Sequence, residues 1–466
     1  MSVRMLSIAV LILGFSDNVR AATCAHSLAV ENVNLLTMED GPSVREGATV
    51  VVCDERVIWI GDAVNAPSLA RARRIDGRGK FLLPTLVDAH VHIENPRMLR
   101  LVLQDASIED ASLDDADVLL PYVAYGVLQV GNLGAMAEAV GQRRAVEAGT
   151  LLGPHMMLAA MVDGDPPLWP VGFTRVAASP SDGRQVVRDE VAEGFDMVKV
   201  YSQLSLDTFS AIVDEARSRG VKVVGHIPGR GTPIDPYFQA DYTIAHAEEL
   251  AFRANDGSDA EVERMVDLAR QNSTGLITTL TLDQRILEQT LDPTTLHTRP
   301  EIAMTHPLTR RFWFDHNPYI DRNSPERITQ LQSLIAFNDK LVRAFVTAGL
   351  PVFAGTDSMV PGVVAGSALH DELAALVNSG LTPYQALDAA TRAPTRWMGV
   401  DSDRGTIAVG KRADLLLLDA NPLLAITNTR RIAGVIDDGR WLSRAELDEK
   451  LHELEQRYQH TLGEKR

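Results

Sequence analysis

Residues 81–402 alternate short apolar runs with amphipathic stretches of helical periodicity, and this alternation restricts the fold more than any other feature. It is typical of parallel strands, because these are joined through helical crossovers. The stretch LDTFSAIVDEARSRG, for example, has apolar residues at helical spacing and a stop signal at Gly220. Eight runs are predicted as strands, at residues 86–93, 127–133, 155–162, 197–201, 221–227, 242–247, 276–282 and 351–357. Eight such α/β units predict a closed barrel.

The two ends of the chain have a different character. Residues 23–80 and 403–441 alternate apolar with polar residues between tight turns, as half-buried strands do. Because chain ends often lie close together, we predict one small β-sandwich domain formed by both segments, with the barrel inserted between them. Residues 442–466 predict an amphipathic helix, which can pack on the barrel or on a second copy in a homo-oligomer.

The first residues have the pattern of an export signal. Arg4 precedes a short apolar run, and small residues follow at Ala21 and Ala22. This predicts a signal peptide over residues 1–22 and a secreted or periplasmic protein without a membrane anchor; the alternative is a frayed helix of a cytosolic protein. An oxidising compartment would permit a disulfide between Cys24 and Cys53, which the sequence leaves open.

The composition limits the class of partner. With 466 residues, of which 45% are hydrophobic, the chain can build a large core. Its 45 Lys and Arg oppose 62 Asp and Glu, giving a net charge of −17. Because binding to phosphates needs a basic face, nucleic acid is excluded as a partner and a small-molecule substrate is expected.

Candidate metal ligands lie on several of the predicted strands. His90 and His92 are two residues apart, so their side chains share one face of a strand and can converge on one metal ion. A histidine pair alone also suits the polar filling of a barrel. Four other strands end in further candidates: Lys199, His226, His246 and Asp357. Because the carboxyl ends of barrel strands meet at one face and buried charges need partners, this set predicts a metal centre.

Five segments resemble, in the same order, the ligand-bearing strands of the amidohydrolase superfamily: LLPTLVDAHVHIENP, FDMVKVY, VVGHIP, TIAHAEEL and FAGTDSM. The chain looks most like the bacterial branch that contains prolidase-like and other Xaa-amino-acid dipeptidases and the relatives of imidazolonepropionase. The resemblance implies a distorted TIM (β/α)8 barrel with an appended β-sandwich and a centre of two divalent ions. Zinc suits such a site, and manganese, cobalt or iron are alternatives.

The resemblance also implies a role for each ligand: His90, His92 and Asp357 for the more buried ion, His226 and His246 for the more exposed ion, and Lys199 as a bridge between them. It implies that this lysine is carbamylated, which turns a cation into an anion with two ligand oxygens. We expect a metal-bridging hydroxide to attack a substrate carbonyl, while Asp357 takes up a proton and passes it to the leaving amine.

Substrate contacts are predicted from residues next to the ligands. Tyr201 and Arg230 follow two ligands closely, and Trp169 lies in a proline-rich loop, residues 163–173. This loop and residues 305–319 form either a lid with aromatic and cationic contacts to a substrate carboxylate or surface loops packed on the barrel.

The expected reaction is hydrolysis of a C–N bond, in a dipeptide or an N-acyl amino acid. One alternative is attack on a cyclic amide, an ester or a phosphoester at the same centre, because one scaffold supports several reactions. Another is a non-catalytic, metal-dependent binding protein, and the presence of Lys199 and Asp357 argues against it.

Overall fold

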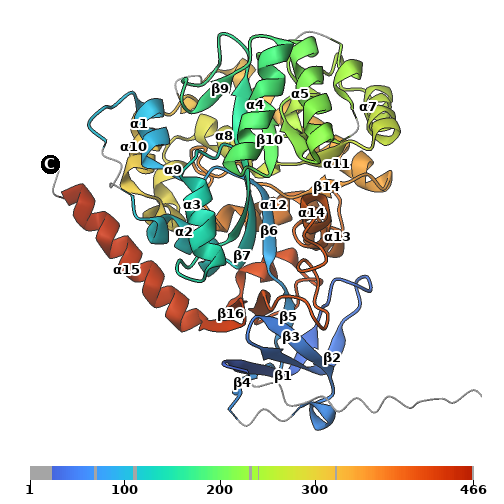
Figure 1. Cartoon of the computed structure of the whole chain (residues 1–466), viewed down its shortest axis with the longest axis vertical. Coiled ribbons are helices and arrows are strands. Elements are labelled where there is room, and N and C mark those ends of the chain that lie inside the picture. The colour runs from blue at the N-terminus through green and yellow to red at the C-terminus, as the bar shows by residue number, and fades with distance from the viewer. Residues whose placement is uncertain are drawn as a thin grey trace, which may run out of the picture.

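The computed structural model describes residues 24–67, 71–108, 113–229, 233–239, 241–320 and 323–463, so the predicted signal peptide lies outside the described residues. Eight parallel strands form a nearly closed barrel, in the order β14-β13-β12-β11-β10-β8-β7-β6, and β9 is added beside β8 (Figure 1). Their bounds are β6 (Leu86–Val91), β7 (Val127–Asn132), β8 (His155–Asp163), β9 (Thr174–Val176), β10 (Met197–Val200), β11 (Lys222–Gly225), β12 (Tyr242–Ala245), β13 (Gly275–Ile277) and β14 (Val352–Phe353). The predicted barrel is confirmed.

Hydrogen bonds close the barrel between its first strand and the segment after its last. The backbone N–H of Asp357 donates to the carbonyl of His90 over 2.8 Å. The buried Asp88 carboxylate accepts from the backbone N–H of Thr356 at 3.0 Å and from its hydroxyl at 2.7 Å. These bonds place His90 and Asp357 side by side at one end of the barrel.

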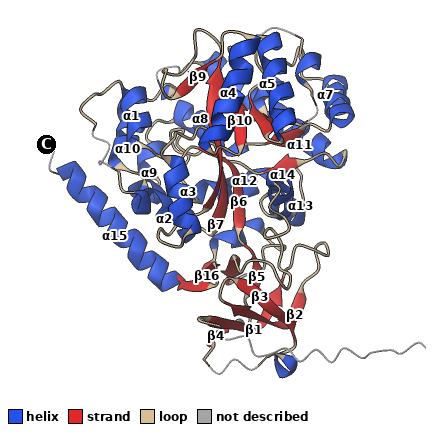
Figure 2. Cartoon of the chain, in the orientation of Figure 1, coloured by secondary structure: helices blue, strands red, loops and turns tan. Residues whose placement is uncertain are grey.

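Helices surround the barrel strands (Figure 2). Their bounds are α1 (Pro96–Leu103), α2 (Asp115–Ala124), α3 (Ala139–Glu147), α4 (Pro180–Glu193), α5 (Leu206–Arg219), α6 (Glu248–Ala251), α7 (Asp259–Asn272), α8 (Leu280–Leu291), α9 (Thr295–Thr298), α10 (Pro307–Asp315), α11 (Pro325–Thr347), α12 (Ser367–Asn378), α13 (Pro383–Ala389) and α14 (Arg392–Met398). Helix α5 is the one predicted from LDTFSAIVDEARSRG. The Ser205 hydroxyl caps its first turn, and Gly220 ends it at φ +70°.

The seventh predicted strand is shorter than expected. Residues 276–282 were predicted as a strand, but β13 ends at Ile277 and α8 begins at Leu280. The buried Glu372 carboxylate accepts from the backbone N–H of Leu280 at 3.0 Å and of Thr281 at 2.7 Å. A carboxylate from α12, far away in the sequence, therefore stabilises the N-terminus of α8. This contact overrides the strand propensity of the threonine-rich sequence.

Both ends of the chain contribute to a second domain, as predicted. Its strands are β1 (Ser27–Leu35), β2 (Arg45–Cys53), β3 (Arg56–Gly61), β4 (Arg73–Asp76), β5 (Phe81–Pro84), β15 (Leu415–Leu418), β16 (Ile432–Asp437) and β17 (Arg440–Ser443). They form one continuous eight-stranded sheet, β17-β16-β15-β5-β1-β2-β3, with β4 beside β1. Strand β5 belongs to this sheet, so the barrel begins at β6 instead of at residue 81. A disulfide joins Cys24 to Cys53.

The last helix, α15 (Arg444–Gly463), runs along the outside of the barrel (Figure 1). Its residues Leu454 and Tyr458 are buried and pack in one cluster with Leu120 of α2. The helix therefore packs on the barrel, which was one of the two predicted alternatives. Among the described residues, no helix has the length and apolar character needed to cross a membrane.

His370 on α12 supports a prediction about stability and pH. It is 1% exposed, Tyr125 and Thr429 are its hydrogen-bonding partners, and burial lowers its pKa from 6.5 to about 4. Between these two values the unfolded chain binds more protons than the folded chain, so stability falls as the pH falls. We expect this residue to cost about 2 kcal/mol of unfolding free energy on going from pH 7.5 to pH 5.

Urea unfolding of the chelator-treated protein at both pH values measures this cost. His370→Gln should lack this part of the pH dependence, because glutamine does not titrate. Equal pH dependence in the wild type and the variant would contradict the assignment.

Candidate metal centre

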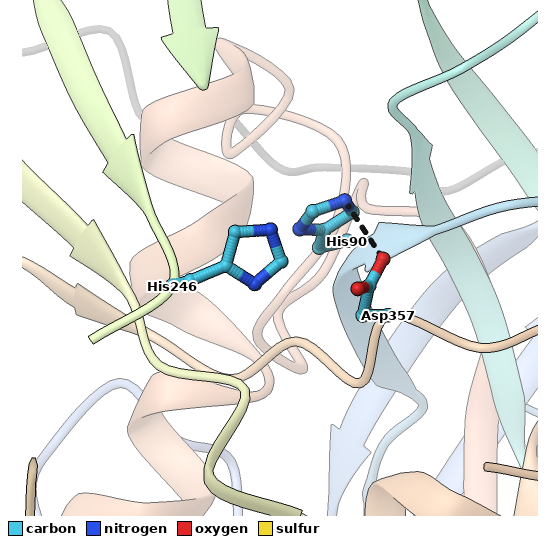
Figure 3. A group of neighbouring side chains, drawn as sticks. All are labelled: His90, His246 and Asp357. Atoms are coloured by element: carbon cyan, nitrogen blue, oxygen red, sulfur yellow. Dashed lines mark ion pairs between the residues drawn. The ribbon is translucent and has the colours of Figure 1, made fainter. Parts of the chain in front are cut away.

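All six predicted ligands lie at the same end of the barrel, where the strands end: His90 and His92 on and after β6, Lys199 on β10, His226 after β11, His246 after β12 and Asp357 after β14. Three of them, His90, His246 and Asp357, are buried and place one ligand atom each within 4.8 Å of the others (Figure 3). Imidazole nitrogens and a carboxylate oxygen at this spacing can hold a metal ion.

The Asp357 carboxylate, which follows the last barrel strand, lies beside the two histidines of the first strand and the residue after it. Its Oδ1 lies 3.2 Å from Nε2 of His90 and 3.0 Å from Nε2 of His92. The Nζ atom of Lys199 lies 3.4 Å from Nε2 of His90, and this lysine is 1% exposed. Each of these four predicted ligands thus lies within 3.4 Å of another ligand.

The other two histidines are contacted at Nδ1 by side chains that were not predicted from the sequence. His226 Nδ1 lies 3.1 Å from the Glu249 carboxylate and 2.9 Å from the Ser202 hydroxyl. His246 Nδ1 lies 2.9 Å from the Thr279 hydroxyl. Partners of this kind fix the orientation of metal-binding imidazoles. The acidic pair in TIAHAEEL, directly after a ligand, was a signal that could have identified Glu249.

Two ligands have a backbone conformation that non-glycine residues adopt rarely. His246 has φ +77° and Asp357 has φ +58°. Just before His226, a Cβ on Gly225 would lie 2.1 Å from the carbonyl oxygen of Val200, so no larger residue fits there. Unfavourable backbone geometry of this kind gathers at functional sites.

Burial sets the charge states of the cluster. It lowers the pKa of His90 and His246 well below the usual range and so disfavours their charged forms. Burial alone would raise the pKa of Asp357, but the neighbouring imidazoles, His90 first, hold it well below its usual range. Burial also lowers the pKa of Lys199 from 10.5 to about 8. Neutral imidazoles beside a carboxylate are the forms that bind metal ions.

A cavity of about 550 Å³ opens beside the cluster. His92, Lys199 and Asp357 line it, together with two of the predicted substrate contacts, Tyr201 and Trp169. The Trp169 indole N–H donates to the Tyr201 hydroxyl over 2.9 Å. The third predicted contact, Arg230, lies outside the described residues.

The segment 305–319 contributes apolar and aromatic side chains to the cavity instead of the cationic ones expected of a lid. Phe312 and Tyr319 line the cavity. Arg311, in contrast, forms an ion pair with Asp105 at 2.8 Å, and His306 Nδ1 caps the first turn of α10. Arg311 and His306 of this segment therefore help to hold α10 in place.

Comparison with known proteins agrees with this geometry. Imidazolonepropionase from Idiomarina loihiensis is 38% identical over 66 residues, which are 14% of this chain and 16% of that protein, so the chain spans about a sixth of this relative. The fold matches a bottromycin amidohydrolase (TM-score 0.70, 23% identity, 92% and 89% of the two chains) and a Xaa-Pro dipeptidase with methionine bound in its active site (0.67, 19%, 90% and 100%). The amidohydrolase family model matches residues 81–442. The chain belongs to the amidohydrolase family.

Proposed function

We propose that this enzyme hydrolyses the amide bond of a dipeptide or an N-acyl amino acid, with two divalent metal ions held by the six predicted ligands. The observation that carries the proposal is the buried group His90, His246 and Asp357 at the carboxyl ends of three strands, open to a cavity of about 550 Å³. In barrels of this type the strand ends form the active site.

The residues present fit metal ions. Within the described part of the chain, Oδ1 of Asp357 is buried without a hydrogen bond, although two imidazole nitrogens lie close to it. Four imidazoles and a carboxylate suit zinc, and they also accept manganese, cobalt or iron. Bound divalent ions would supply a water-derived nucleophile at neutral pH and would polarise the substrate carbonyl.

Lys199 is suited to carbamylation. Because its pKa is lowered to about 8, an appreciable fraction of the amine is neutral at neutral pH. The neutral nitrogen can form a bond to the carbon of CO₂ and lose one proton, which gives a carbamate. The product carries a negative charge in a cluster of neutral imidazoles, where an ammonium would repel a metal cation.

Asp357 is placed to move a proton. Its carboxylate lies at the edge of the cavity, among His90 and His92, and remains ionised. It can accept a proton from the attacking water and donate it to the nitrogen of the leaving amine, so that one carboxylate acts as base and then as acid.

The test is a turnover assay on a panel of dipeptides and N-acyl amino acids, with the protein loaded with zinc, manganese, cobalt or iron. We expect cleavage of at least one member and loss of activity on addition of a chelator. The panel also contains cyclic amides, esters and phosphoesters; activity on one of these alone would replace the proposed substrate class. Inactivity of the metal-loaded protein on every member would favour a binding protein.

We also propose that the protein is exported and works in an oxidising compartment. The Cys24–Cys53 disulfide supports this proposal, because structural disulfides are rare in the cytosol. Fractionation of producing cells, with the mature N-terminus identified by mass spectrometry, tests it. Recovery of the uncleaved chain from the cytosol would contradict it.

A further inference from the structure

The lining of the cavity beside the metal centre is of two kinds. One part consists of ligands. The other part, which we call the apolar wall, contains apolar side chains: Met161, Leu168, Trp169, Phe173, Phe312 and Val360. Its polar groups are the hydroxyls of Tyr201 and Tyr319, which are uncharged. Among the described residues that line the cavity, Lys199 is the only lysine or arginine, and it is one of the predicted ligands.

The apolar wall is formed before any substrate arrives. Trp169 is fixed by its hydrogen bond to Tyr201. The loop that carries it is held by the fully buried Asp163 carboxylate, which accepts from the backbone N–H of Leu168 at 2.9 Å and of Gln203 at 2.6 Å. These bonds join the loop after β8 to the loop after β10. A ligand that uses this wall therefore orders few side chains on binding.

Two arginines of the neighbouring segments are engaged elsewhere. Arg311 on α10 pairs with Asp105 at 2.8 Å. Arg253, which follows α6, donates to the backbone carbonyls of Gly229 at 3.0 Å and of Pro228 at 3.1 Å. Neither guanidinium lines the cavity. Within the part of the chain that the structure describes, the apolar wall thus offers no lysine or arginine to pair with a substrate carboxylate.

We infer that this wall selects an uncharged apolar group of the substrate, an aromatic or branched aliphatic side chain beside the scissile amide, and rejects a carboxylate in the same place. The inference rests on the proposed amide hydrolysis and adds a substrate class to it. A carboxylate would lose its hydration without gaining a partner, whereas an apolar group gains from leaving water. Trp169, which Tyr201 holds in place, is the contact that we assign to this group, and Leu168, also in the lining, is 57% exposed.

Two matched pairs of substrates test the inference, because the group can lie on either side of the amide. N-(3-phenylpropanoyl)-alanine is compared with N-succinyl-alanine, and N-acetyl-phenylalanine with N-acetyl-glutamate. In at least one pair we expect the apolar member to have a kcat/KM about 100-fold higher. Equal values, or a preference for the charged member in both pairs, would overturn the inference.

Two variants test whether the apolar wall causes the preference for apolar substrates. Trp169→Ala should lower kcat/KM for the preferred aromatic substrate by about 10-fold or more and leave that for its charged partner nearly unchanged. Leu168→Arg should raise the relative rate of the charged partner, because it adds a cation to the cavity lining. Leu424→Ala is the matched control, since this leucine is 83% exposed and does not line the cavity. If neither Trp169→Ala nor Leu168→Arg changed the ratio of kcat/KM between the two substrates, the assignment of the apolar wall would be contradicted.

A binding measurement separates this inference from the proposed function. The uncleaved amides 3-phenylpropanamide and succinamate are titrated into the metal-free protein and followed by ligand NMR. The inference is supported, even if no substrate is hydrolysed, when 3-phenylpropanamide binds more tightly than succinamate and Trp169→Ala weakens it about 10-fold. It is overturned when 3-phenylpropanamide does not bind or binds the variant equally well.

Discussion

Replacement of Lys199 with alanine is expected to lower the metal content from about two ions per chain to one or fewer, and turnover by about 1000-fold or more. The lysine is buried in the cluster, and its Nζ lies 3.4 Å from Nε2 of His90, so alanine removes the group proposed to bridge the ions. The measurement is elemental analysis of protein purified without chelator, together with steady-state turnover on the best substrate of the panel.

Lys222→Ala is the matched control, because Lys222 lies on the neighbouring strand β11 and outside the cavity lining. It should keep the wild-type metal content and turnover. A single ion that both variants retain, with turnover unchanged, would mean that Lys199 is not a bridge. The mechanism would then have to be rebuilt around one metal ion.

Replacement of Asp357 with asparagine is expected to lower kcat by about 100- to 10,000-fold when measured with zinc in excess. The amide cannot accept and return a proton, although it keeps nearly the same shape. Asparagine is the suitable replacement because Asp357 has φ +58°, and asparagine tolerates the left-handed conformation better than other residues do. Loss of activity would therefore reflect chemistry and not a distorted backbone.

Asp54→Asn serves as its control. Asp54 also has a positive φ, +50°, in the turn between β2 and β3, far along the chain from the metal centre. This variant should match the wild type in kcat and in its circular dichroism spectrum. If Asp357→Asn kept most of its turnover with the ions still bound, the proton-transfer role of Asp357 would be wrong.

The barrel and the position of the ligands followed from local pattern. In β10, Met197 and Lys199 alternate with Val198 and Val200, and this two-residue period decides which side chains share a face. Parallel strands of a barrel also end at one face whatever their detailed packing. Residue type and place on a strand were therefore enough to predict that these six side chains lie at one end of the barrel, and their binding of metal ions stays a prediction.

The start of α8 could not be predicted locally. Residues 276–282 carry the β-branched residues of a strand, but Glu372, about 90 positions later in the chain, binds the N–H groups that begin the helix. Glu249 had a local signal, the acidic pair after a ligand, but its contact with His226 depends on how α6 turns after β12. A local pattern contains no information on contacts between distant segments.

The sequence by itself thus determined the fold class and indicated the candidate ligands that the structure brings to one end of the barrel, because both depend on periodicity and on the shared end of parallel strands. Only the tertiary structure decided which groups hold the histidines and what faces the substrate. Trp169, Tyr201 and Phe312 come from three separate segments, and they form one apolar wall only after the loops between them have folded. Loop conformation depends on long-range contacts such as that between Asp163 and Gln203, which has no local signature.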